Sequence, residues 1–366
     1  MKSIIWIALL FSFSVARAGA DSTNYYKVFT GNIMGAEAVL HLYVSKGEAT
    51  GYLYFVRDPR PFTIYTGEVK MVKTDSIYIY SSRSHMVSVN IAGSLTGQQI
   101  IGNATMYQDD KEIRKGAVQL MANTDRYTAL NYIHSSGTTE LPANLKNQST
   151  CRYAASTVWP VSSDKSPLAG VIRKLFYETF NQQPGKEPSV LLPAALQKYL
   201  NGWKNSYIKA GVKETQDMGL SLSQEGDERL LVLSESGQLL TLAYYSYSFS
   251  GGAHGGSTTK LFSFDKRVNK LLTLSDVLTP AGIAALPSLL AKSARAQFKV
   301  QANQSLKDVG LFENSIPVTQ NFWMDNAGLG FWYQEYEIGP FAYGPIVLFI
   351  PLAQISSFIQ PGFLKK

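Results

Sequence analysis

The sequence contains a single cysteine, Cys151, among its 366 residues. One cysteine cannot form an intramolecular disulfide, so the fold must be held by hydrophobic cores, which a chain of this length can build. We interpret Cys151 as a buried structural thiol or a residue at a linker edge, because a reactive thiol needs an exposed, electropositive setting. The cysteine count therefore excludes the disulfide-rich class of small exported domains.

The sequence also lacks the spacings that mark metal and nucleophile sites. Three of its four histidines, His41, His85 and His134, lie singly in the first half, and no H-x-x-x-H or C-x-x-C spacing occurs. Metal sites usually need several ligands close together, so we expect no metal and no cofactor. A G-x-S-x-G motif is absent as well, so we assign no catalytic residues.

No apolar run is long enough to span a membrane, which takes about 20 residues. The most apolar late segment, Ile346 to Ile359, is interrupted by Pro351 and Gln354. The apolar run at the N-terminus, Ser3 to Val15, is too short for a span and follows Lys2. We therefore expect no transmembrane segment.

That N-terminal run has the pattern of a secretory signal instead. Ala18-Gly19-Ala20 places small residues where a signal peptidase cleaves, which predicts a signal peptide over residues 1–20 and a mature chain from Asp21. Ala16-Arg17-Ala18, with cleavage before Gly19, is the alternative. The protein is thus expected to be exported to the periplasm or outside the cell.

Charge is sparse, at 17% of residues, with a formal net charge of +7. Lysines and arginines occur singly or in pairs, whereas a nucleic-acid interface needs them clustered, so we expect no nucleic-acid partner. Hydrophobic residues make up 45% and aromatic residues 12%, a composition typical of folded rather than disordered chains.

Residues 21–134 show a period-two pattern. Short alternating stretches such as Ala38 to Val44, Thr50 to Val56 and Gln99 to Tyr107 are separated by turn residues. This pattern predicts a β-rich domain, an antiparallel meander or barrel. Residues 135–150 are polar, with Gly, Pro and Asn, and are typical of a linker.

Residues 151–366 mix helical and strand patterns. Apolar spacing predicts helices from Pro167 to Asn181, from Pro193 to Tyr207 and from Pro280 to Gln301, with strands between and after them. We therefore predict an α+β fold overall, with helices packed on an antiparallel sheet in this second domain.

Four motifs of the second domain follow a family pattern. Gly251-Gly252-Ala253-His254 is followed by Phe264-Asp265 and then by Leu272-Thr273-Leu274-Ser275-Asp276. The closing stretch Tyr336 to Pro345 reads YEIGPFAYGP. Residues 151–366 thus resemble the RsiV-like C-terminal domain of unknown function, the GGAH-motif family also found in the peptidoglycan deacetylase PdaC. The resemblance implies an extracytoplasmic domain, which in RsiV recognises lysozyme. We expect the partner of this chain to be a lysozyme-type protein or a cell-wall glycan.

The candidate site combines the glycine-rich loop with the closing stretch. Glycines permit positive φ and close backbone approach, so the loop either binds a partner or forms only a tight turn. We expect both segments to lie in one antiparallel sheet. The predicted ligand- or partner-binding residues are Gly251, Gly252, Ala253, His254, Tyr336, Glu337 and Tyr343.

Three functions fit these patterns. The first is a non-catalytic binding module of the cell envelope, for a lysozyme-type protein or a glycan. The second is an envelope hydrolase in which His254 and Glu337, or Glu335, act as an acid–base pair. The third is a structural envelope protein without a small ligand.

Overall fold

The computed structural model describes residues 24–364, apart from residues 73, 85–86, 142–148, 211–221 and 302. The predicted signal peptide and His85 lie outside the described residues. Among the described helices, none is both long and apolar enough to cross a bilayer.

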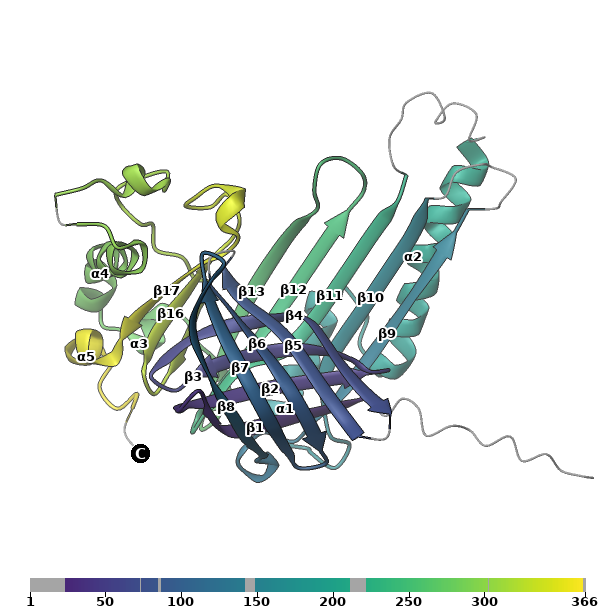
Figure 1. Cartoon of the computed structure of the whole chain (residues 1–366), viewed down its shortest axis with the longest axis horizontal. Helices are drawn as coiled ribbons and strands as arrows, with labels where there is room; N and C mark the ends of the chain where they lie inside the picture. Colours follow the sequence, from purple (N-terminus) through teal and green to yellow (C-terminus); the bar gives the residue numbers. More distant parts are fainter. Residues whose placement is uncertain are drawn as a thin grey trace, which may run out of the picture.

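Eight antiparallel strands close into a barrel, which confirms the β-rich first domain (Figure 1). Each strand pairs with the next, and the first pairs with the eighth over Phe29↔Ala122 to Ile33↔Val118. The strands are β1 (Tyr25–Ile33), β2 (Ala36–Ser45), β3 (Glu48–Phe55), β4 (Asp58–Val72), β5 (Thr74–Ser84), β6 (Val87–Thr96), β7 (Gln99–Gln108) and β8 (Lys111–Ala122).

Strand β2 is buried on both faces, one inside the barrel and one outside it. Leu40 and Leu42 point into the barrel and join its interior core. His41 and Tyr43 point outward, since neighbouring side chains of a strand face opposite ways, yet both are fully buried. Tyr43 belongs to the core shared with the second sheet, so the outside of the barrel is itself a packing surface.

A six-stranded sheet follows the barrel, in the order β14-β13-β12-β11-β10-β9. The expectation of an antiparallel sheet is wrong at one pair, because β10 and β11 run parallel from Cys151↔Gln224 to Thr157↔Leu230. A parallel pair needs a long crossover, which α1 (Pro167–Thr179) and α2 (Pro188–Ala210) provide. The strands are β9 (Leu130–Glu140), β10 (Thr150–Pro160), β11 (Gln224–Ser236), β12 (Leu239–Phe249), β13 (Gly256–Asp265) and β14 (Lys270–Leu271).

The first strand of this sheet corrects the predicted linker. Residues 135–140 belong to β9 and pair with β10 from Ser135↔Ala155 to Glu140↔Thr150. Gly137 contributes no side chain, and Leu196 and Leu200 of α2 fill the space above it. The polar composition of this stretch fits a strand half-covered by a helix, and residues 142–148 lie outside the described part of the chain.

A separate three-stranded sheet ends the chain. It consists of β15 (Phe322–Asp325), β16 (Gly328–Tyr333) and β17 (Ile346–Pro351), with α4 (Pro280–Phe298) packed on β17 and with α3 (Leu274–Val277) and α5 (Leu352–Ile355) nearby (Figure 1). The expectation that the glycine-rich hairpin and the closing strands share one sheet is therefore wrong. The mixed α+β class is confirmed.

Two amide side chains explain how the sheets meet without strand pairing. Asn321 Oδ1 accepts a hydrogen bond from Leu261 N at 2.7 Å, and its Nδ2 donates to Thr259 O at 2.8 Å. Gln334 likewise accepts from Thr259 N at 2.9 Å and donates to Thr259 O at 2.6 Å. These amides satisfy the exposed edge of β13 as a neighbouring strand would.

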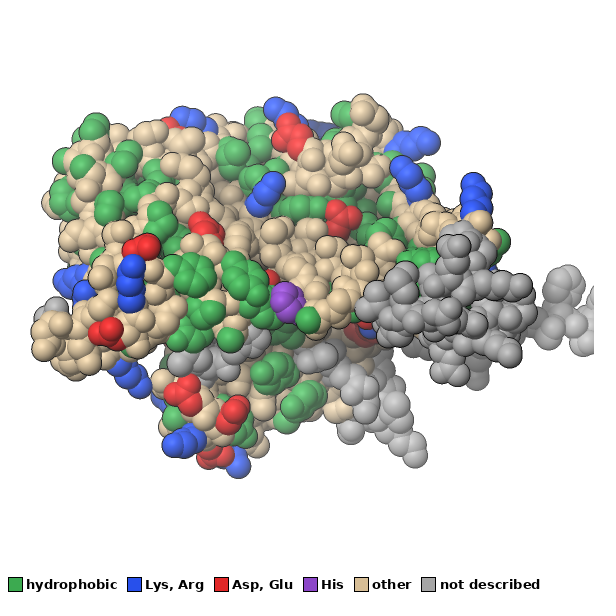
Figure 2. Space-filling model, turned by 90° about the horizontal axis from the view of Figure 1, so that it is seen from above, with side chains coloured by type: hydrophobic (Ala, Val, Ile, Leu, Met, Phe, Trp, Pro, Cys, Tyr) green, Lys and Arg blue, Asp and Glu red, His purple; other side chains and the backbone are tan. Residues whose placement is uncertain are grey.

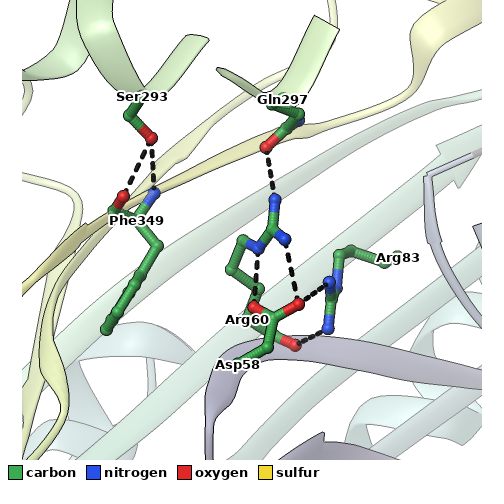
Figure 3. Close-up of polar contacts among 6 residues, drawn as sticks. All are labelled: Asp58, Arg60, Arg83, Ser293, Gln297 and Phe349. Atoms are coloured by element: carbon green, nitrogen blue, oxygen red, sulfur yellow. Dashed lines mark hydrogen bonds and ion pairs between the residues drawn. The ribbon is translucent and has the colours of Figure 1, made fainter. Parts of the chain in front are cut away.

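A polar network ties the barrel to α4 at a second place (Figure 3). Asp58 accepts from Arg60 Nε at 2.7 Å and from Arg83 Nη1 at 2.6 Å. Arg60 Nη1 in turn donates to Gln297 Oε1 of α4 at 2.9 Å. Ser293 of the same helix exchanges hydrogen bonds with the backbone of Phe349, which fixes α4 on β17.

Candidate functional site

A groove runs between the barrel and the six-stranded sheet. It consists of two adjoining cavities of about 380 Å³ and 350 Å³, which share Thr50, Tyr65, Arg229 and Tyr247. Volumes of this size are typical of small-molecule sites. The first cavity, which we call the polar half of the groove, is also lined by Ser45, Glu48, Tyr132, His134, Arg152, Glu225 and Asp227. The second cavity, which we call the aromatic half of the groove, is also lined by Tyr52, Tyr245, His254, Gly255, Ser257, Trp332, Glu335 and Phe341.

Strand register places the central groove residues on one face. Arg229 of β11 lies opposite Tyr245 of β12, and Asp227 lies opposite Tyr247. Residues two apart on a strand face the same way, so these four side chains project together. All four line the groove.

Arg229 joins the two domains where the halves of the groove meet. Its guanidinium forms a bidentate ion pair with Asp227, and its Nη1 donates to Thr50 Oγ1 of the barrel at 2.7 Å. It also lies 5.6 Å from the centre of the Tyr245 ring. Burial alone would lower the pKa of Arg229, but Asp227 raises it, so this side chain stays charged.

In the aromatic half, His254 stacks on Phe341 with ring centroids 4.0 Å apart. His254 Nδ1 lies 2.8 Å from Gly255 O, which places the proton on Nδ1 and leaves Nε2 available. Glu335 Oε1 accepts a hydrogen bond from Ser257 Oγ at 3.2 Å. The two sheets therefore meet at this end of the groove through side chains.

Two buried polar atoms along the groove have no hydrogen-bond partner among the described residues. They are Ser45 Oγ in the polar half and Trp332 Nε1 in the aromatic half. The residues are only 4% and 5% exposed. A buried polar group without a partner costs about 1–3 kcal/mol, and both atoms are closed off from the space of the groove.

The residues of the GGAH motif have two different locations: three of them form a turn, and His254 lines the groove. Gly251 and Gly252 both have φ of +96°, a left-handed conformation that favours glycine. They and Ala253 form the turn between β12 and β13 and do not line either cavity described above, whereas His254 does. The backbone of the motif thus shapes the turn, and the histidine reaches the groove.

The three predicted residues of the closing stretch have different surroundings. Tyr336 is 58% exposed and its ring lies 5.6 Å from Phe341, beside the aromatic half. Glu337 Oε2 accepts from Gln334 N at 2.7 Å and so holds a local turn. Tyr343 Oη donates to Val309 O at 2.5 Å, while its ring packs on Phe298, away from the groove.

The predicted acid–base pair of His254 and Glu337 is not joined by a hydrogen bond in the described part of the chain. Glu337 faces the backbone of Gln334, and the carboxylate that shares the cavity with His254 is Glu335.

Four residues that join the two cavities were not predicted as site residues from the sequence: Thr50, Tyr65, Arg229 and Tyr247. The sequence does contain one indication of this site, namely two i, i+2 pairs on consecutive strands: Asp227/Arg229 and Tyr245/Tyr247. Such pairs share a face, but the sequence does not show that the barrel covers that face.

His41 and Cys151 are each buried in the described part of the chain. His41 is buried between the barrel and the sheet, and burial lowers its pKa to about 3. Cys151 is buried in β10, where desolvation raises the pKa of its thiol to about 11. Within the described ranges, no group of three or more His, Cys, Asp or Glu side chains could hold a metal ion. Cys151 is therefore a structural thiol rather than a linker residue.

The face in Figure 2 carries its Lys and Arg side chains singly or in small groups, with acidic side chains between them. The basic residues are thus scattered on this face, as they are along the sequence.

Comparison with known proteins connects part of the chain to a family. Residues 275–353 match the model of a family described as protein of unknown function (DUF3298). No curated protein matches the chain. The match is narrower than the resemblance predicted over residues 151–366.

A solved structure described as a member of the same family is similar in fold. A DUF3298 family member from Bacteroides fragilis shares 23% identity with a TM-score of 0.56, covering 64% of this chain and 94% of its own. A DUF3298 family protein from Pseudomonas aeruginosa shares 17% identity with a TM-score of 0.44, covering 64% and 95%. Residues 275–353 therefore carry a DUF3298 domain, and 64% of the chain shares the fold of the Bacteroides protein.

Proposed function

We propose that this protein is an exported, non-catalytic binding protein of the cell envelope, and that its groove binds a glycan segment. The N-terminal pattern from Lys2 to Ala20 supports export. The resemblance to the RsiV-like domain also supports an extracytoplasmic binding role.

The aromatic lining of the groove carries this proposal. Tyr65 and Tyr247 line both cavities, and Tyr245 and Trp332 line the aromatic half. A single elongated ligand that lies along the groove would therefore contact several aromatic rings.

The aromatic lining favours sugar rings over other polar ligands. A pyranose has an apolar C–H face and a rim of hydroxyl groups. Tyr and Trp offer the matching combination of a flat apolar ring and a polar tip. Tyr65, Tyr245, Tyr247 and Trp332 all line the aromatic half, and the polar half adds carboxylates and hydroxyls that could orient the hydroxyl rim.

Calorimetric titration of the purified full chain would test the proposal. The probes are two β-1,4-linked tetrasaccharides, one of N-acetylglucosamine and one of glucosamine. At least one is expected to bind, and Tyr65→Ala is expected to weaken binding about tenfold, the equivalent of ~1.4 kcal/mol. Tyr78→Ala is the matched control, because Tyr78 is similarly exposed (48% against 51%) on the neighbouring barrel strand and does not line the groove.

Two results would contradict the proposal. If neither sugar binds while a lysozyme does, the ligand is a protein, the alternative that the family resemblance implies. If Tyr65→Ala and Tyr78→Ala weaken sugar binding equally, the sugar is bound elsewhere than in the groove.

A further inference from the structure

Carboxylates outnumber guanidiniums along the groove. Among the residues that the structure describes, its lining carries four carboxylates against two guanidiniums, although the chain as a whole has a formal charge of +7. Arg229 and Asp227 neutralise each other in their bidentate pair. The remaining acidic residues are Glu48, Glu225 and Glu335, opposed only by Arg152.

These three carboxylates have no ion-pair partner among the residues that the structure describes. Elsewhere in the protein, carboxylates such as Asp58, Asp265 and Asp276 are each paired with a lysine or an arginine. Glu335 is half-buried at the aromatic end, where it accepts only the Ser257 hydroxyl. A carboxylate held in a cavity without a counter-charge favours a ligand that brings one.

The rings around Glu335 favour the same kind of charge. Tyr65, Tyr245, Tyr247 and Trp332 line this half together with His254 stacked on Phe341. The face of an aromatic ring carries negative potential and attracts an ammonium group. Trp332, 5% exposed, adds its flat apolar ring to this lining.

We propose that the groove selects an amino sugar whose amine is free, and that Glu335 binds the ammonium group in the aromatic half. This inference rests on the proposed glycan-binding function and specifies its ligand class. An N-acetyl group would cover the nitrogen and leave Glu335 without a counter-charge. A free amine supplies the positive charge while the same sugar ring still stacks on the tyrosines.

Calorimetry with the same two tetrasaccharides would test this selectivity. At pH 6 an amine with a pKa of about 8 is protonated. The glucosamine tetramer is expected to bind about tenfold more tightly than the N-acetylated tetramer, as a charge-assisted hydrogen bond allows. In Glu335→Gln, which keeps the shape but removes the charge, this preference should fall to about twofold or less.

Glu178→Gln is the matched control, since it removes one negative charge from an exposed position on α1. It should leave the preference unchanged. Equal binding of the two tetramers to the wild-type chain would overturn this inference and leave the glycan proposal standing. A preference that survives Glu335→Gln, or falls equally in Glu178→Gln, would also overturn it. Binding of neither tetramer would instead reject the glycan function itself.

Discussion

Gly255 leaves the space that the ring of Tyr247 occupies. A Cβ at position 255 would lie 2.5 Å from three atoms of that side chain, closer than real Cβ contacts come. Gly255 has no left-handed φ, so its lack of a side chain serves this close approach. Because Tyr247 lines both halves of the groove, the glycine helps to set the groove's shape.

Gly255→Ala should therefore displace the Tyr247 ring and weaken glycan binding. We expect a loss of about three- to tenfold, since small displacements in a binding site are costly. Gly256→Ala provides the control, because a Cβ there meets nothing within 4 Å. Both variants should be titrated with the tetrasaccharide that binds the wild-type chain, after circular dichroism confirms that each is folded. Equal affinities for the two variants would show that the Tyr247 position does not matter.

The sequence predicts the turn formed by Gly251 and Gly252, but it does not predict the close contact at Gly255. The sequence shows four glycines around His254 and predicts a turn, which Gly251 and Gly252 form with φ of +96°. The requirement at Gly255 comes from a side chain of the preceding strand, and it becomes visible only when the hairpin is closed.

The barrel was predictable because the side chains along its strands alternate between the two faces. Leu40 and Leu42 on one face of β2, with His41 and Tyr43 on the other, give a period of two. The burial of the outer face was not predictable, since it depends on which surface the second sheet covers. The same limit explains the missed groove, whose residues come from both sides of that contact.

The single-sheet expectation was wrong for a related reason. Strand patterns do not show whether an edge is satisfied by another strand or by side chains. Here Asn321 and Gln334 bind the edge of β13, so the closing strands form their own sheet. His254 and Phe341 nevertheless meet across the two sheets.

Thr50 supplies the barrel's side of the hydrogen bond to Arg229, and Thr50→Val would remove it while keeping the side-chain shape. Its loss, together with that of the Thr50 hydrogen bond to Ile64 O, should lower the free energy of unfolding by about 1.5 kcal/mol, the lower end of the range for hydrogen bonds to charged groups. Thr50→Ser, which keeps the hydroxyl, serves as the control and should lose less. Urea unfolding would measure both, and equal losses would mean that the hydroxyl contributes nothing.

Arg229→Ala should destabilise the protein more than Thr50→Val. It leaves Asp227 without its partner, and breaking a buried pair costs about 3–5 kcal/mol. Since the side chains of Arg229 and Asp227 are 26% and 19% exposed, solvent should reduce the loss to about 2–3 kcal/mol. Adding Asp227→Asn should restore part of the loss, and a double variant less stable than the single one would contradict this account.

Tyr43 fixes the barrel on β11, because its hydroxyl accepts from Val232 N at 2.8 Å and is fully buried. Tyr43→Phe keeps the ring but leaves the Val232 amide unsatisfied, which should cost about 1–3 kcal/mol. Tyr78→Phe, at an exposed barrel position, should cost nothing measurable. Hydrogen exchange at the Val232 amide would report the same change locally, and unchanged protection there would contradict the role of the hydroxyl.

Asp325 should make stability depend on pH between about 4 and 6. Its carboxyl is buried in the β15–β16 turn, and burial raises its pKa to about 6 even though the amides of Ala327 and Gly328 donate to it. The unfolded chain releases this proton near 3.8. Stability from this group is therefore full below about pH 4 and falls as pH rises to 6, by up to about 3 kcal/mol.

Asp325→Asn should remove that dependence, because the amide oxygen still accepts both backbone N–H groups and carries no charge to bury. We expect the variant to gain up to about 2 kcal/mol at pH 7.5 and nothing at pH 4. Lys270 beside Asp276 lowers the pKa of that carboxyl to about 2, so its own titration falls below this window. Urea unfolding at both pH values would measure the difference, with Asp110→Asn as an exposed control. A variant less stable than the wild type at pH 7.5 would show that the charged form of Asp325 stabilises the turn.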